Sequence, residues 1–166
     1  GLLGIKVNLR RARVYDAGKA LELINTKADS NILLPRGPKY FYENIRDFVV
    51  VETAGDKVEP EIIACGSLHI LWKDISEIRA LAVHPQHQRC GYGSKIVRTL
   101  TEEARHMGID RVYALSQYVE FFKKLGFVPE KREDLPPRLW GECIKCPKYF
   151  QCDETGLVFD TQAECG

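Results

Sequence analysis

The chain has 166 residues, 45% of them hydrophobic, which suits one domain of ordinary size with a real core. Lys and Arg total 24 against 23 Asp and Glu, and this near-neutral balance, with a formal net charge of +1, does not favour nucleic acid or an anionic membrane as the main partner. No apolar run approaches the roughly 20 residues that a membrane span needs, and the first residues lack the charge order of a secretory signal. We therefore expect a single cytoplasmic domain over residues 1–166.

The first half of the chain predicts one strand, two helices and then three strands. Apolar and polar residues alternate over residues 7–13, as in a strand. Apolar residues recur at helical spacing over residues 17–28, with Asp16 as the N-cap, and a second, short helix is expected over residues 40–45. Three β-rich runs follow, at residues 48–52, 62–71 and 75–83.

The second half alternates helices and strands. One apolar stripe runs along a long helix at residues 94–107, and Gly108 is well placed to end it. The other expected elements are a strand at residues 111–115, a short helix at 119–125, and strands that start at 127 and 157. Three successive strands followed by alternating helices predict an α/β (α+β) domain with a mixed sheet and helices on its faces.

The most informative segment is the loop Gln-Arg-Cys-Gly-Tyr-Gly-Ser at residues 88–94, between a predicted strand and the long helix. Such a junction presents unpaired backbone N–H groups at the positive end of the helix dipole, where an anion binds. Glycine lets the backbone approach the anion closely. The Gly-Lys-Ser/Thr ending of a nucleoside-triphosphate P-loop is absent. An ordinary turn and helix cap is the alternative interpretation of Gly-x-Gly alone.

The pattern Gln88-x-x-Gly91-x-Gly93 resembles the Gln/Arg-x-x-Gly-x-Gly/Ala signature of GNAT N-acetyltransferases, whose loop amides bind the pyrophosphate of coenzyme A. Residues 80–85 resemble the family's fourth strand, and residues 121–127 its short helix with a Gly-Phe ending. The resemblance implies the GNAT fold, a mixed and mostly antiparallel central sheet flanked by helices, with acetyl-CoA as co-substrate. It implies cofactor contacts from Leu81, Ala82, Val83, Gln88, Arg89, Cys90, Gly91, Tyr92, Gly93 and Ser94.

Further segments resemble short, single-domain N-acetylglutamate synthases, the amino-acid N-acetyltransferases of arginine biosynthesis. They are Leu34-x-Arg36, Ile45-Arg46-Asp47-Phe48, Glu77-x-x-x-Leu81-Ala82-Val83-His84-Pro85, Leu135-Pro136 and the cysteine-rich tail at residues 140–166. The likeness runs from about residue 7 to residue 158. It implies acetyl transfer to the α-amine of an amino acid, L-glutamate first, as the first step of arginine biosynthesis.

Acetyl transfer needs a group that removes a proton from the attacking amine, and a carboxylate can serve. Glu77 lies 14 residues before Gly91 (91 − 77) and resembles the strand-four glutamate base of family enzymes, although an ordinary strand-end carboxylate is the alternative. Many family members carry a tyrosine acid before the Gly-Phe ending, where this chain has Phe122. Ser116 and Tyr118 are the nearby substitutes, and unassisted departure of the thiolate is the third option.

An acidic acceptor needs cationic groups for its two carboxylates, and the planar fork of arginine binds a carboxylate bidentately. Arg36 and Arg138 stand where the resembling synthases face their acceptor. Arg79 lies two residues after Glu77 and should point to the same face of the strand. Each arginine alone could be a solvated surface residue, but together they favour an acidic acceptor.

The spacing Cys143-x2-Cys146-x5-Cys152 offers three thiolate ligands for a structural zinc. Cys165 could be a fourth ligand, and a set of reduced thiols or a disulfide is the alternative.

Two rival functions stay open at this point: a GNAT enzyme acting on another amino acid, a polyamine or a protein amine, and a non-catalytic acyl-CoA-binding module. The expected partners are a small-molecule acceptor and acetyl-CoA, without nucleic acid or membrane. The oligomeric state is open, with a homodimer among the options.

Overall fold

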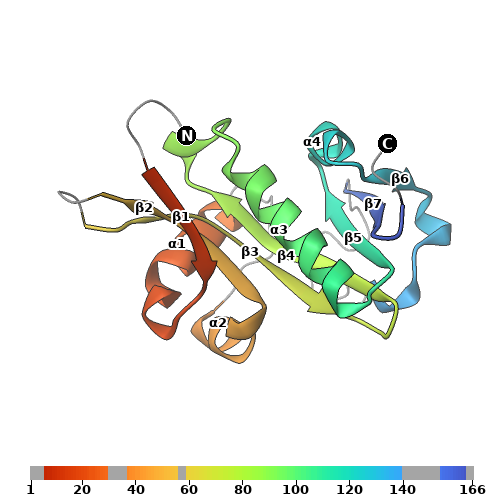
Figure 1. Cartoon of the computed structure of the whole chain (residues 1–166), viewed down its shortest axis with the longest axis horizontal. Coiled ribbons are helices and arrows are strands. Elements are labelled where there is room, and N and C mark those ends of the chain that lie inside the picture. Colours follow the sequence, from red (N-terminus) through yellow and green to blue (C-terminus); the bar gives the residue numbers. More distant parts are fainter. Residues whose placement is uncertain (1–5, 30–36, 56–58, 140–153, 164–166) are drawn as a thin grey trace. The chain divides into compact units, whose positions relative to one another are not determined.

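The computed structural model of the chain describes residues 6–29, 37–55, 59–139 and 154–163 (Figure 1). In chain order its main elements are β1 (Lys6–Arg11), α1 (Ala17–Asp29), α2 (Pro38–Glu43), β2 (Phe48–Ala54), β3 (Ile62–Ile70), β4 (Ile75–Val83), α3 (Tyr92–Met107), β5 (Arg111–Ser116), α4 (Val119–Lys124), β6 (Val128–Glu130) and β7 (Thr155–Asp160). Every helix and strand expected from the sequence is present, with ends shifted by one or two residues. Short 3-10 turns, which the sequence did not predict, join several of them.

The seven strands form one sheet in the order β1-β2-β3-β4-β5-β7-β6. The pairs β1/β2, β2/β3, β5/β7 and β6/β7 are antiparallel, and β4/β5 is parallel. This confirms the mixed, mostly antiparallel sheet. The chain divides into two compact units, the first made of residues 1–67 and 80–97 and the second of residues 68–79 and 98–166.

In the first unit, α1 and α2 lie beside β1 and β2 (Figure 1). Both helices present apolar side chains at helical spacing, and these pack against apolar residues of the strands because burial removes their surface from water. The rings of Phe41 in α2 and Phe48 in β2 lie 4.9 Å apart, centre to centre. The cluster comprises Ala17, Ala20, Leu21, Leu23, Ile24, Phe41, Phe48, Val50, Ile62, Cys65, Ala80 and Ala82.

A partly buried ion-pair network joins β1 and β2 to the start of α1. Arg10 binds Asp16 with two hydrogen bonds of 2.8 and 2.9 Å, and it binds Glu52 with two more of 3.0 and 3.1 Å. Asp16 also accepts a 2.7 Å hydrogen bond from the backbone N–H of Arg13. The residue therefore directly precedes α1, as expected of an N-cap, but its carboxylate binds Arg10 and Arg13.

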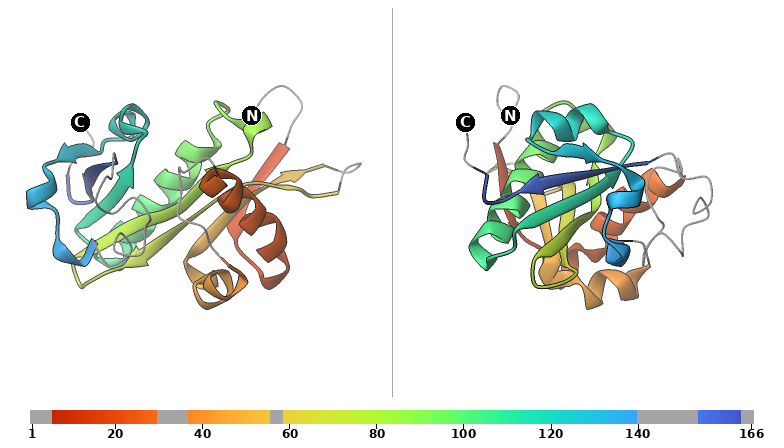
Figure 2. Two further views of the ribbon diagram at one scale, coloured as in Figure 1. Left: turned by 180° about the vertical axis from the view of Figure 1, so that it is seen from behind. Right: turned by 90° about the vertical axis from the view of Figure 1, so that its right-hand side faces the viewer.

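In the second unit, β7 lies between β5 and β6 (Figure 2, right). Its core packs Ile75 and Tyr113, from β4 and β5, against Leu135 and Leu139. Gly156 in β7 makes this packing possible, since a Cβ at that position would lie only 2.5 Å from Leu135. Across the residues that the structure describes, no helix is long and apolar enough to cross a membrane.

Candidate active site

The loop after β4 leads into the start of α3 in the first unit, where the sequence predicts a phosphate site. The first helical bond of α3 runs from Lys95 N–H to the carbonyl of Gly91, at 3.0 Å. The geometry of an α-helix leaves the amides of its first turn without an acceptor inside the helix, and in α3 these belong to Tyr92, Gly93 and Ser94. They add to the positive end of the helix dipole. The loop therefore has the form that the sequence predicts for a phosphate site.

Positive φ angles shape this loop. Gly91 has φ = 85° and Arg89 has φ = 65°. A Cβ at Gly91 would meet no protein atom within 4 Å, so the position demands glycine for its backbone conformation and leaves open space beside it. The positive φ of Gly91 agrees with the need for glycine in such a loop.

The side chains of the predicted cofactor residues differ in how far they are buried. Tyr92 is only 3% exposed, so its ring packs inside the first unit and offers little surface to a ligand. Ala82 packs into the core of the first unit, and Leu81 and Val83 are half-buried. Cys90 is half-buried, with its sulfur 3.6 Å from the carbonyl of Gln88. The contacts that this segment can offer a cofactor are therefore mainly from its backbone.

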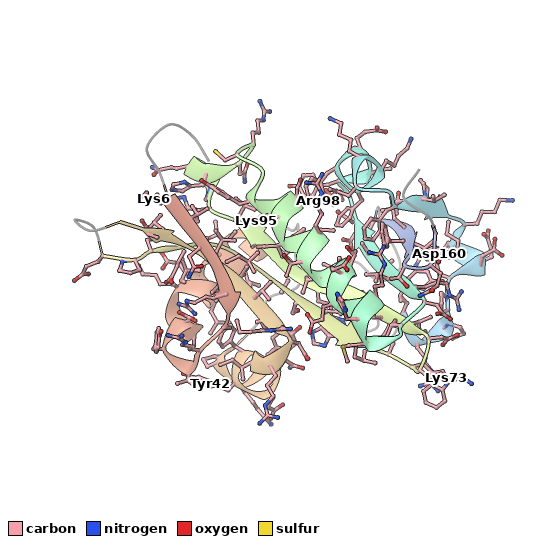
Figure 3. All side chains as sticks on the ribbon, in the orientation of Figure 1. Lys6, Tyr42, Lys73, Lys95, Arg98 and Asp160 are labelled. Atoms are coloured by element: carbon pink, nitrogen blue, oxygen red, sulfur yellow. The ribbon has the colours of Figure 1, made fainter. Side chains whose placement is uncertain are left out.

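Basic side chains continue from the loop along the helix. Lys95 is exposed near the start of α3, where Figure 3 labels it. Arg89 is exposed in the loop itself. These cations could complement further negative charge on a ligand held by the helix start.

Ala80 gives β4 an unusual backbone, with φ = 56° inside the strand. A left-handed conformation is uncommon for a residue with a Cβ and costs about 1–3 kcal/mol, a strain that clusters at functional sites. Among the residues that the structure describes, Ala80 and Arg89 are the two non-glycine residues with positive φ. One lies just after Arg79 and the other lies in the loop, so both belong to segments already selected by the sequence.

The second unit holds Glu77, the predicted base. The parallel ladder between β4 and β5 pairs Glu77 with Tyr113 as its last pair, although both strands continue. Glu77 is 4% exposed. Its Oε1 accepts a 2.7 Å hydrogen bond from Nε of Arg79, which confirms that the two side chains share a face.

Tyr113, the ladder partner of Glu77, has a side-chain contact within β5. Its hydroxyl accepts a 3.1 Å hydrogen bond from Arg111, two residues back along β5. Burial raises the pKa of the tyrosine, and the charge of Arg111 only partly offsets this effect. The hydroxyl thus belongs to a structural contact at the start of β5.

The segment around Arg138 covers the sheet face that carries Glu77. Ile75 lies two residues before Glu77 and so projects to the same face. It packs against Leu135 and Leu139, which flank Arg138. The guanidinium carbon of Arg138 lies 3.7 Å from the ring centre of Trp72, in the turn between β3 and β4. The fold thus brings Arg138, Arg79 and Glu77 to one face of the second unit.

Ser116 and Tyr118 lie together at the end of β5. The hydroxyl oxygen of Ser116 accepts a 2.9 Å hydrogen bond from the backbone N–H of Tyr118. The O–H of Ser116 remains able to donate, because a hydroxyl carries its own proton. Tyr118 is 50% exposed, whereas Phe122 is 3% exposed and packs on Phe127. The position of the usual family tyrosine is therefore occupied by a core residue.

Several predicted residues lie outside the described part of the chain: Arg36, Cys143, Cys146, Cys152 and Cys165. The zinc site therefore stays a prediction. Within the described residues no group of three or more His, Cys, Asp or Glu side chains is arranged to hold a metal ion. Of the two other cysteines, Cys65 is fully buried, and burial raises its pKa to about 12.

Sequence reasoning missed two residues of this region. Trp72 contacts Arg138 across a separation of 66 positions (138 − 72), so no local pattern could connect them. Ala80 gave no signal either, because alanine normally avoids positive φ and a strand pattern predicts ordinary extended backbone.

Comparisons with known proteins agree with this geometry. The model of the Acetyltransferase (GNAT) family matches residues 21–127. An amino-acid acetyltransferase of Mycobacterium tuberculosis is 37% identical over 119 residues, which cover 72% of this chain and 67% of that protein. An uncharacterized N-acetyltransferase of Chlorobaculum tepidum is 30% identical over 150 residues, which cover 90% of this chain and 94% of that protein.

The fold is also similar to a solved structure. The N-acetylglutamate synthase of Neisseria gonorrhoeae, complexed with coenzyme A and N-acetyl-glutamate, superposes with a TM-score of 0.82 at 28% identity. The match covers 95% of this chain but only 36% of the gonococcal chain, so this chain spans about a third of that protein's length.

Proposed function

The chain belongs to the acetyltransferase (GNAT) family, and we propose that it transfers the acetyl group of acetyl-CoA to the α-amine of L-glutamate. It is an acetyl-CoA-dependent N-acetyltransferase. An amino acid as acceptor is supported by the relative named amino-acid acetyltransferase. Glutamate is supported by the similarity to a synthase complexed with N-acetyl-glutamate. The reaction would be the first step of arginine biosynthesis, in the cytoplasm.

The observation that carries this proposal is the buried Glu77 carboxylate hydrogen-bonded to Arg79 on β4, 2.7 Å apart. Acetyl-CoA supplies the thioester that the amine attacks. Glu77 accepts the proton that the amine releases as the new C–N bond forms. The hydrogen bond from Arg79 fixes the rotamer of the carboxylate, so that the base is oriented before the acceptor arrives.

The loop of the first unit would hold the cofactor. The amides of Tyr92, Gly93 and Ser94 receive the pyrophosphate at the start of α3. Gly91 leaves room for this approach. Residues 81–83 end β4 just before the loop, and their backbone would contact the rest of the cofactor.

Ser116 and Tyr118 are the proposed proton donors for the departing sulfur. The hydrogen bond that Tyr118 N–H donates to Ser116 fixes the Ser116 oxygen and leaves its proton available. Tyr118 is exposed and directly precedes α4, two residues after the end of β5. Separate replacement of Ser116 and of Tyr118 distinguishes these alternatives. Loss of turnover in one variant identifies the proton donor, and unchanged turnover in both indicates that the thiolate departs unassisted.

Arginines would bind the two carboxylates of the acceptor. Arg79 donates to Glu77 through Nε and is the first proposed clamp. Arg138 lies on the same sheet face, and Arg36 is the third proposed clamp. A site built from arginines favours an acidic acceptor, because leaving a desolvated guanidinium unpaired is costly.

An acceptor panel tests the proposal. The protein is mixed with acetyl-CoA and each free amino acid, a polyamine or a lysine peptide, and release of the CoA thiol is measured. We expect glutamate to give the highest kcat/KM and N-acetylglutamate to appear by mass spectrometry. Preference for a basic amine would contradict the acidic acceptor. Binding of acetyl-CoA without thiol release for any amine would indicate the non-catalytic module instead.

A further inference from the structure

The guanidinium of Arg138 stacks on the indole of Trp72, with 3.7 Å between the guanidinium carbon and the ring centre. Trp72 lies in the turn from β3 to β4, where its backbone N–H donates a 3.2 Å hydrogen bond to the carbonyl of Ile75. Ile75 in turn begins the strand that carries Glu77. The backbone of Trp72 is therefore held against the strand that presents the proposed base.

Arg138 is anchored on its own side as well. It lies in a 3-10 turn, Pro137–Leu139, and the neighbouring Leu139 is completely buried. The backbone of Arg138 is thus held by the core of the second unit, and its long side chain is held by Trp72. An arginine side chain loses much rotamer entropy when it is ordered for binding, so ordering it in advance favours ligand binding.

The stack leaves the binding groups of Arg138 available. A cation–π contact uses the flat face of the guanidinium, whereas its N–H donors lie in the plane and point outward from its edge. A carboxylate can therefore bind the edge while the indole holds the face. Trp72 is 52% exposed, so this contact is not part of the hydrophobic core.

We propose that Trp72 is a positioning residue that holds Arg138 for one carboxylate of the acceptor, and that it thereby strengthens the preference for an acidic acceptor. The inference deepens the proposed function and rests on it. Trp72 acts through Arg138 and takes no part in proton transfer. Its removal should therefore change acceptor binding and spare both cofactor binding and the chemical step.

The experiment compares Trp72→Ala, Trp72→Phe, Arg138→Ala and the double variant Trp72→Ala/Arg138→Ala. Lys73→Ala is the matched control, since Lys73 is exposed in the same turn (Figure 3). Steady-state kcat and KM are measured for glutamate, glutamine and acetyl-CoA, and circular dichroism checks the fold of each variant.

Trp72→Ala should raise the KM for glutamate about 2- to 5-fold, the size of an exposed cation–π contact. It should leave kcat and the KM for acetyl-CoA unchanged, and Trp72→Phe should restore part of the loss. In the Arg138→Ala background the second substitution should add nothing, because the two residues act as one unit. Lys73→Ala should behave as the unmodified protein.

Equal effects of Trp72→Ala with and without Arg138 would overturn the inference, as would an unchanged KM for glutamate. Either result leaves the proposed function intact as long as the unmodified protein acetylates glutamate. If the unmodified protein does not acetylate glutamate, the proposed function itself fails, and the inference fails with it.

Discussion

Nε of Arg79 donates a 2.7 Å hydrogen bond to Oε1 of Glu77, and the two side chains are only 15% and 5% exposed. The pair lies where the ladder between β4 and β5 ends, just before the strained backbone of Ala80. A carboxylate in this position is oriented by a charged partner and shielded from water. These are the properties expected of a positioned base rather than of a surface carboxylate.

Replacing Glu77 by glutamine should lower turnover about 10²- to 10⁴-fold, the usual contribution of a general base. The defect should shrink at high pH, because more of the amine is then already neutral. Turnover is measured by thiol release across a pH series at saturating acetyl-CoA. Glu120→Gln is the control, since the Glu120 side chain is 80% exposed on α4 and should tolerate the change. Unchanged turnover of Glu77→Gln at neutral pH would remove Glu77 from the mechanism.

Gly91→Leu should abolish detectable binding of acetyl-CoA, because its side chain would project into the space beside the loop amides. Gly108→Leu is a matched control. Gly108 has φ = 84° against 85° for Gly91, and a Cβ at either would meet no atom within 4 Å. Both variants should lose about 1–2 kcal/mol of stability from the left-handed backbone. Calorimetric titration with acetyl-CoA should then show binding by Gly108→Leu and no binding by Gly91→Leu. Normal binding by Gly91→Leu would contradict the assignment of the loop.

Asp16→Asn should destabilise the protein at neutral pH by about 1.5–3 kcal/mol, the range for hydrogen bonds to charged groups. Burial raises the pKa of Asp16, but hydrogen bonds from Arg10 and from the N–H of Arg13 outweigh it and hold the pKa below 3.8. Hydrogen bonding from Arg10 likewise holds the pKa of Glu52 below 4.5.

A carboxylate with a lowered folded-state pKa contributes its full stabilisation above its unfolded pKa, and loses it as the pH falls through the folded value. The difference between Asp16→Asn and the unmodified protein should therefore be largest at neutral pH and narrow below about pH 4. Urea unfolding of both proteins at neutral pH and below about pH 4 measures this difference in the free energy of unfolding. A difference of the same size at neutral and acidic pH would show that Asp16 does not act through its charge.

The sequence predicted the elements and the shared face of Glu77 and Arg79 because those features are local. Hydrophobic periodicity marks α3, and the alternation of side chains along a strand is enough to place Arg79 on the same face as Glu77. The glycines of the loop predicted a helix start open to an anion. Gly91 indeed has the positive φ that such a loop requires.

The features that the sequence did not predict depend on contacts between distant positions. Arg10 and Glu52 are 42 positions apart, and nothing near either residue indicates the other. Asp16 has the residue type and place of an N-cap, but the guanidinium of Arg10 competes for its carboxylate. The strain at Ala80 is imposed by the surrounding fold, against the intrinsic preference of alanine.

The most direct test of the account compares kcat/KM for glutamate and glutamine in the unmodified protein and in Arg138→Ala. The unmodified protein should prefer glutamate by about 10- to 150-fold, because glutamine leaves a charged hydrogen bond unmade, worth about 1.5–3 kcal/mol. Arg138→Ala should reduce that ratio toward one and leave the KM for acetyl-CoA unchanged. Arg138→Lys should recover only part of the preference, because lysine keeps the charge and loses the planar fork. Equal use of glutamate and glutamine by the unmodified protein, or a preference for lysine or a polyamine, would contradict an acidic acceptor held by these arginines.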